Sequence, residues 1–241
     1  MRYAVLSDIH ANLEALRAVL ADCRGEVDGA VCLGDLVGYG ADPIPCIELL
    51  AERAVALVAG NHEYGVTGKL ALGWFNSYAR AAAAWTAEQL DVDHRAYLGS
   101  LALTALVAEA TLVHASPSRP DEWEYLITAE EGFDAFSAFD TRLCFIGHSH
   151  RPAYWSLGAT GPVWGSGAFD IALESGRRYL VNVGSVGQPR DRDPRACYAI
   201  WDRTARRITI RRVTYDVAEA RRKIIAAGLP RLLADRLENG T

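Results

Sequence analysis

Residues 3–20, YAVLSDIHANLEALRAVL, join a short apolar run to a helical pattern through the polar residues Asp8 and His10. The apolar run at 3–7 has the length and aliphatic content of a strand that is covered on both faces. Asn12 is a favoured N-cap residue, and the leucines that follow it recur on one face of a helix. This segment therefore predicts the first strand and the first helix of an α/β fold.

The same alternation of strand and helix continues through the first half of the chain. Two further apolar runs, 29–33 and 54–58, flank a helical segment at 43–53 that opens with a proline. This β-α-β-α-β order predicts parallel strands joined by right-handed crossovers. Downstream, we expect helices at 77–90 and 128–139 and strands at 110–114 and 142–146.

Beyond residue 150 the apolar runs are shorter, and Gly, Pro and Asp separate them, which predicts an antiparallel meander. The predicted strands lie at 152–157, 169–173, 178–183, 196–202 and 206–213, and a helix follows at 217–227. The whole pattern predicts a mixed sheet of two layers covered by helices. We interpret the basic run RRITIRR (206–212) as one strand of a hairpin with solvated arginines, rather than as a site for an anionic partner.

Composition indicates a soluble globular protein, since 50% of the 241 residues are hydrophobic and 23% are charged. We expect a single domain over 1–241. The five cysteines are odd in number and form no C-x-x-C pair, which favours a reducing, cytoplasmic location. No run approaches the roughly 20 apolar residues of a membrane span. The net charge of −5 disfavours general nucleic-acid binding.

Polar side chains that can bind metal follow five of the predicted buried strands. Open α/β sheets place their sites at this edge, where the strands end. Five of the six histidines fall at these positions, and only His94 lies elsewhere. The candidate residues are Asp8, His10, Asp35, Asn61, His62, His114, His148 and His150.

Spacing predicts that these side chains converge. In an extended chain, residues i and i+2 point to the same side, so the Asp-x-His and His-x-His pairs would each face one site. Glycines 34, 60 and 147 precede candidate ligands and allow the backbone to approach closely. Two Asp, one Asn and four His are too many for one tetrahedral ion, and their nitrogen and oxygen donors favour Mn²⁺, Fe or Zn²⁺ over a structural zinc.

The motifs D-x-H, G-D, G-N-H-E, a lone His and G-H-x-H, in this order over residues 3–190, resemble those of the calcineurin-like metallophosphoesterases. The stretches GDLVGYG and NVGSVGQPRD resemble the small bacterial branch of phosphodiesterases and protein-phosphatase-like proteins. The resemblance implies an α/β fold, a four-layer α-β-β-α sandwich with two mixed β-sheets.

The resemblance also implies a site with two divalent metal ions, with Mn²⁺ favoured and Fe, Zn²⁺ or Ni²⁺ as alternatives. Around the first ion it implies Asp8, His10, Asp35 and His150. Around the second ion it implies Asp35, Asn61, His114 and His148, with Asp35 bridging the two. His62 would be the catalytic histidine that contacts phosphate or protonates the leaving group.

The implied reaction is hydrolysis of a small phosphate ester by a metal-activated water, in a phosphodiesterase or a phosphatase. A non-catalytic interaction scaffold is the alternative from another class, but such relatives lose site residues that are all present here. A protein phosphatase is disfavoured because GDLVGYG lacks the Arg of G-D-x-x-D-R-G, and a nuclease is disfavoured by the net charge. Substrate contacts are expected from Asn12, Tyr39 and Arg190, and a small cap element at about 64–80. The choice between monoester and diester and the oligomeric state stay open.

Overall fold

The strand predicted at 3–7 is at the centre of the first sheet, where the computed structural model of residues 1–241 places it as β1 (Arg2–Leu6). The strand order of this sheet is β3 (Ala54–Leu57), β2 (Gly29–Cys32), β1, β11 (Ala196–Asp202), β12 (Arg207–Val213) and β9 (Asp170–Ala172). Strands β1, β2 and β3 are parallel, as predicted, and the other pairs are antiparallel.

The second sheet also mixes parallel and antiparallel pairs. Its strand order is β4 (Thr104–Val107), β5 (Ala110–Val113), β6 (Leu143–Ile146), β10 (Arg178–Asn182), β7 (Ala153–Leu157) and β8 (Val163–Ser166). Strand β10 pairs in parallel with β6 and antiparallel with β7. The predicted meander after residue 150 is therefore wrong, because its strands are divided between two sheets. Apolar runs predict which segments are buried strands, but they do not specify the partner of each strand.

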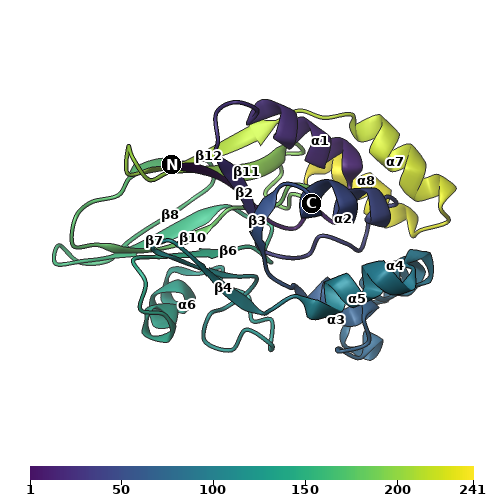
Figure 1. Cartoon of the computed structure of the whole chain (residues 1–241), viewed down its shortest axis with the longest axis horizontal. Helices are drawn as coiled ribbons and strands as arrows, with labels where there is room; N and C mark the ends of the chain where they lie inside the picture. Colours follow the sequence, from purple (N-terminus) through teal and green to yellow (C-terminus); the bar gives the residue numbers. More distant parts are fainter.

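Eight α-helices surround the two sheets. They are α1 (Leu13–Asp22), α2 (Pro43–Ala51), α3 (Asn61–Val66), α4 (Ser77–Gln89), α5 (Val92–Ser100), α6 (Ala129–Asp134), α7 (Val217–Ala226) and α8 (Arg231–Asn239). Helix α1 lies over the first sheet and α6 under the second, α7 and α8 pack together beside α1, and α3, α4 and α5 gather at one end (Figure 1). No helix is long and apolar enough to cross a membrane.

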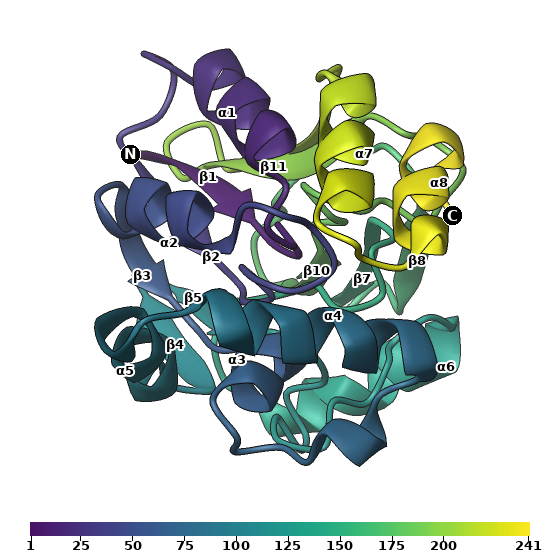
Figure 2. The same ribbon diagram turned by 90° about the vertical axis from the view of Figure 1, so that its right-hand side faces the viewer.

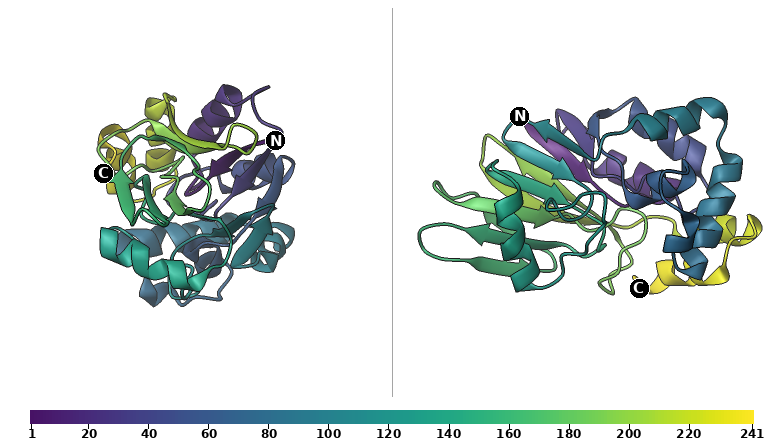
Figure 3. Two further views of the ribbon diagram at one scale, coloured as in Figure 1. Left: turned by 90° about the vertical axis from the view of Figure 1, so that its left-hand side faces the viewer. Right: turned by 90° about the horizontal axis from the view of Figure 1, so that it is seen from below.

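Three buried clusters hold the layers together. Leu16 of α1 packs against the outer face of the first sheet. Val5 and Phe145 belong to the cluster between the two sheets. Trp155 and Phe136 pack together on the outer face of the second sheet, under α6. Because successive residues of a strand point to opposite faces, strands buried on both faces build a sandwich of two sheets between helices. The predicted α-β-β-α sandwich is confirmed, and Figure 3 shows it from two further sides.

Five elements escaped prediction, namely α3, α5, α8, β4 and β8. Strand β8 is an edge strand, exposed on most of its residues, and its sequence VWGS lacks a clear alternation. Helix α3 begins at Asn61 of the G-N-H-E motif, in which the sequence predicts a ligand and a catalytic histidine but no helix. Helix α7 ends at Ala226, as its stop signal predicts, but Pro230 then caps the start of α8 instead of ending the helical region.

The basic strand β12 forms a hairpin with β11, as predicted from RRITIRR. Its arginines are paired rather than simply solvated. Arg211 lies 3.2 Å from Asp22 and 2.7 Å from Glu26, and Arg207 lies 2.6 Å from Asp170. These ion pairs neutralise most of the positive charge on this face of the sheet.

Candidate metal centre

The predicted ligands meet beyond the carboxyl ends of β1, β2, β3, β5 and β6. In Figure 1, β1 runs from the N-terminus toward the end of the molecule that holds α3 and α4, and Figure 2 looks onto that end. All eight candidate side chains are buried there, each no more than 4% exposed. They come from loops of both sheets, so the centre lies where the edges of the two sheets converge. The eight residues are Asp8, His10, Asp35, Asn61, His62, His114, His148 and His150.

The backbone that presents these side chains is not extended, so the i, i+2 spacing of an extended chain does not explain why they converge. Asp8 and His10 have φ of 52° and 49°, and His148 and His150 have φ of 62° and 59°. Asp35 has φ of 50°. Non-glycine residues in this left-handed region are uncommon and cost about 1–3 kcal/mol each. Five strained candidate residues in one centre indicate that the surrounding hydrogen bonds and packing fix these loops.

Close backbone approach at the three glycines is confirmed. A Cβ on Gly60 would lie 2.1 Å from Oδ1 of Asp35, and a Cβ on Gly34 would lie 2.5 Å from the Gly60 nitrogen. A Cβ on Gly147 would lie 1.8 Å from Oγ of Ser7. Real Cβ atoms do not come so near, so only glycine lets these loops pack around the ligands.

The first half of the centre consists of Asp8, His10 and His150, whose ligand atoms all lie within 4.8 Å of one another. Nε2 of His150 lies 3.2 Å from Nε2 of His10 and 3.2 Å from Oδ1 of Asp8. Oδ1 of Asp8 is buried and has no hydrogen-bond partner. The free carboxylate oxygen and the two ring nitrogens therefore converge on one point.

The second half consists of Asp35, His114 and His148, again within 4.8 Å of one another. Nε2 of His114 lies 3.3 Å from Oδ2 of Asp35 and 3.1 Å from Nδ1 of His148. Oδ2 of Asp35 also lies 3.7 Å from Nε2 of His10, in the first half, so this carboxylate stands between the two clusters. Oδ1 of Asn61 is buried without a hydrogen-bond partner.

The donor set fits divalent cations. His10, His114 and His150 each lie with Nδ1 at hydrogen-bond distance from a backbone carbonyl, which fixes the proton on Nδ1 and leaves a lone pair on Nε2. Two such lone pairs, on His10 and His150, face each other at 3.2 Å and repel, unless a cation lies between them. The carbonyl acceptors are Val37, Leu33 and Gln188, at 3.1, 2.9 and 2.6 Å.

The electrostatics of the centre agree with this fit. Burial alone would raise the pKa of Asp35, but the neighbouring His114 and His62 lower it well below its usual value. Burial lowers the pKa of His114, but Asp35 raises it, to about 9. Burial lowers the pKa of His148 to about 3. The buried carboxylates therefore require positive charge beside them. A divalent cation would displace the proton on His114 and supply more positive charge than that proton does.

His62 lies beside the two clusters rather than between them. It shares a third group of converging ligand atoms with His10 and Asp35. Its ring lies 4.9 Å from the ring of His10 and 4.5 Å from that of Tyr39, and its Nδ1 is buried without a partner. Burial lowers the pKa of His62 to about 4, although Asp35 opposes this.

The three expected substrate residues lie on one side of the centre. Tyr39 is buried between His10 and His62, and the guanidinium of Arg190 lies 5.7 Å from the Tyr39 ring centroid. Arg190 is half-buried and faces this ring, so it is more than a charged surface turn. Asn12 caps α1 and donates to the carbonyl of Gly187 at 2.8 Å, so its amide joins two loops of the centre.

Glu63 is a residue of the site that the sequence reasoning missed. Its carboxylate is fully buried and accepts four backbone N–H bonds. The donors are Asp35, Leu36, Val37 and Gly60, at 2.8, 2.8, 3.2 and 2.7 Å. Glu63 therefore joins the loop after β2 to the loop after β3, and so holds two predicted ligands in register. The signal was available, since G-N-H-E places a Glu three residues after a helix N-cap.

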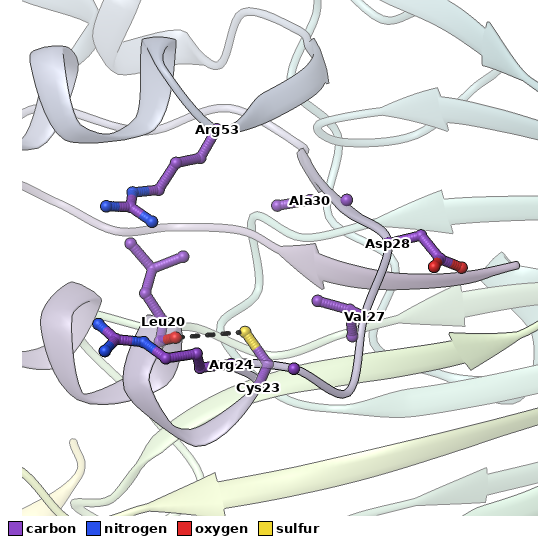
Figure 4. Close-up of a pocket in the computed structure, with 9 residues that line it drawn as sticks. Leu20, Cys23, Arg24, Val27, Asp28, Ala30 and Arg53 are labelled. Carbon is purple, nitrogen blue, oxygen red and sulfur yellow. Dashed lines mark hydrogen bonds between the residues drawn. The ribbon is translucent and has the colours of Figure 1, made fainter.

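Tyr125 was also missed. Its ring stacks on His148 with centroids 4.1 Å apart, and nearly half of the residue is exposed. The pocket drawn in Figure 4, lined by Leu20, Arg24 and Arg53 among others, holds none of the candidate ligands. It lies near the start of β2, at the opposite end of the strands from the centre.

Comparisons with known proteins agree with this geometry. A family model for the calcineurin-like phosphoesterase superfamily domain matches residues 1–206. An uncharacterized protein of Methanocaldococcus jannaschii is 41% identical over 246 residues, covering 97% of this chain and 96% of that protein. The crystal structure of a metallophosphoesterase from Sphaerobacter thermophilus has a TM-score of 0.88 at 44% identity, over 100% of this chain and 99% of that one. A hypothetical protein from Pyrococcus horikoshii OT3 shares the fold, with a TM-score of 0.77 at 21% identity over 100% and 98% of the two chains.

Proposed function

The chain belongs to the calcineurin-like phosphoesterase superfamily, and from that premise we propose that it hydrolyses small phosphate esters with two divalent ions. It is a metallophosphoesterase with buried clusters of Asp and His. One observation carries the proposal of two ions, namely that Asp35 stands between two such clusters, at 3.7 Å from His10 and 3.3 Å from His114.

In the proposed site, each cluster would hold one ion, and Asp35 would contribute to both. The first ion is assigned to Asp8, His10, Asp35 and His150, and the second to Asp35, Asn61, His114 and His148. The mixture of carboxylate, amide and imidazole donors without thiolate suits Mn²⁺ best and would also accept Fe, Zn²⁺ or Ni²⁺. The two histidines of G-H-x-H would then serve different ions.

Bound divalent ions supply a lowered pKa for an attacking water and positive charge that offsets the charge developing on the phosphoryl group. The protein side chains bind the substrate and orient the groups around it. Arg190, beside Tyr39, is placed to bind a non-bridging phosphoryl oxygen, and Tyr39 orients His62 by ring contact. Asn12 fixes the loop at Gly187 against the loop that carries His10.

His62 is assigned the transfer of a proton to the departing oxygen. Burial favours its neutral form, whereas an anionic phosphoryl group beside the ring favours the protonated form, so substrate binding raises the pKa of His62. The proton is then present when the leaving group needs it.

A small substrate follows from the burial of the centre, because no candidate side chain is more than 4% exposed. The phosphate of a folded phosphoprotein would have to reach past the rim, that is, the residues that surround the buried centre. The segment 64–80 lies at this rim, where Phe75 contacts the His62 ring at 5.1 Å and Trp74 is about half exposed. We assign it as a cap within a single domain over 1–241.

The test is turnover of chromogenic phosphate esters by metal-free protein to which Mn²⁺, Zn²⁺ or Ni²⁺ is added back. We expect hydrolysis of p-nitrophenyl phosphate or bis(p-nitrophenyl) phosphate with at least one ion, its loss on chelation, and its return with Mn²⁺. Protein that binds two ions per chain and hydrolyses neither ester would refute the proposal.

Replacing His62 by Asn should lower kcat for phenyl phosphodiesters by about 100-fold, the usual contribution of a general acid. The loss should be smaller for p-nitrophenyl diesters, because p-nitrophenolate leaves without needing a proton. His94→Asn is the matched control, since His94 lies outside the centre and contacts Asp91 at 2.8 Å. Equal losses for both leaving groups would contradict the assigned role and indicate phosphate binding alone.

A further inference from the structure

A pocket of about 420 Å³ lies next to the metal centre and is lined by three arginines, Arg151, Arg190 and Arg192. The rest of its lining is Pro152, Ser166, Gly167 and Asp191, so Pro152 is its one apolar side chain. We call it the arginine pocket. An apolar molecule would gain little there, whereas an anion would find three guanidinium donors.

The charges of the arginine pocket are not neutralised from within the protein. Arg151 and Arg192 are exposed and form no ion pair, and Nε of Arg190 is buried without a hydrogen-bond partner. The one carboxylate in the lining, Asp191, is bonded to Arg212, whose side chain is only 7% exposed. The pocket therefore keeps a net positive charge.

The arginine pocket is directly connected to the metal centre. Arg151 follows the predicted ligand His150 in the chain, and its Nε donates to the Arg190 carbonyl at 2.9 Å. Arg190 in turn donates to the side chain of Gln188 at 3.0 Å, and the carbonyl of Gln188 accepts from His150 at 2.6 Å. A phosphoryl group at the centre and an anion in the pocket would thus lie on either side of Arg190.

The other side of the centre has the opposite charge. A second pocket, of about 480 Å³, lies beside Tyr125 and is lined by Glu124, Glu131 and Asp134. Since Tyr125 stacks on His148 at 4.1 Å, this acidic pocket also borders the centre. Additional negative charge on a substrate is repelled there, so it is accepted only on the side of the arginine pocket.

We propose that the preferred substrates carry a second phosphoryl group, as in nucleoside polyphosphates, and that the arginine pocket binds this group while the first is hydrolysed. The inference rests on the proposed function and adds a substrate class to it. Guanidinium groups bind phosphate through paired, charge-assisted hydrogen bonds, so the contribution of Arg151 and Arg192 should be large.

The first experiment measures binding of inorganic tripolyphosphate to the metal-free protein by calorimetry in the presence of chelator. The double variant Arg151→Ala/Arg192→Ala should bind it about tenfold more weakly than the wild type. The matched control is Arg24→Ala/Arg53→Ala, which removes two exposed arginines from the pocket of Figure 4. Equal binding by the wild type and both variants would overturn the proposal.

The second experiment measures ATP as a competitive inhibitor of bis(p-nitrophenyl) phosphate hydrolysis, with free Mn²⁺ held constant. In the Arg151→Ala/Arg192→Ala variant, the inhibition constant of ATP should rise about tenfold, while the KM of the diester, which has a single phosphoryl group, stays within about twofold. An unchanged inhibition constant would overturn the proposed role of the arginine pocket without contradicting the proposed hydrolase activity. Absence of diester hydrolysis by the wild type refutes the proposed function itself.

Discussion

Replacing Asp35 by Asn should lower kcat/KM for bis(p-nitrophenyl) phosphate by about 1,000-fold, equivalent to about 4 kcal/mol of transition-state stabilisation. The change keeps the shape of the side chain, and Oδ1 can still accept the backbone N–H of His62, now at 2.9 Å. It removes the negative charge that lies between His10 and His114. Both proposed ions lose a ligand at once, so metal analysis should also find fewer than two ions per chain.

Asp170→Asn is the matched control for this variant. Asp170 is a half-exposed carboxylate on β9 that pairs with Arg207, so its loss should leave metal content and activity unchanged. An Asp35→Asn protein that retains two ions and activity within tenfold of the wild type would show that Asp35 does not bridge them.

Replacing Glu63 by Gln should lower the free energy of unfolding by about 3 kcal/mol in the metal-free protein. The carboxylate of Glu63 accepts four backbone N–H bonds, two of them from Asp35 and Gly60. A Gln presents an NH₂ group to one pair of these donors, so buried N–H groups lose their acceptor. Urea denaturation with an unchanged m-value measures the effect.

Glu131→Gln is a matched control because Glu131 occupies the same position in another capping box. It accepts the backbone N–H groups of Ile127 and Thr128 at 2.8 and 2.9 Å, but it is exposed. Its replacement should cost less than about 1 kcal/mol, because water can satisfy the freed donors. Equal costs for the two variants would show that burial of Glu63 does not account for its contribution.

The sequence predicts the parallel strands and the converging residues of this protein well, for a physical reason. Strands such as β1 and β6 are buried on both faces and therefore read as continuous apolar runs, and the first polar residue marks the end of each run. Parallel strands end on one edge of a sheet, so Asp8 and Asp35, which follow the parallel neighbours β1 and β2, had to lie near each other once both runs were identified.

What the sequence did not predict depends on contacts between distant segments. The left-handed φ of Asp8, His10 and His148 is fixed by loops from both sheets. The assumption of an extended chain therefore predicted the convergence of these side chains correctly but for the wrong reason. The four hydrogen bonds of Glu63 join loops that are far apart in sequence. The apolar runs after residue 150 did not reveal which sheet each strand would join.

The position of β10 and β11 has a consequence for how the chain folds during synthesis. Strand β11 borders β1 on the side away from β2, and β10 lies between β6 and β7, yet both come from the last third of the sequence. Until the ribosome has released residues 178–202, β1 and β6 each retain an unpaired edge beside the hydrophobic interior. Long-range pairing of this kind slows folding, so nascent chains should depend on chaperones most strongly just before that stretch emerges.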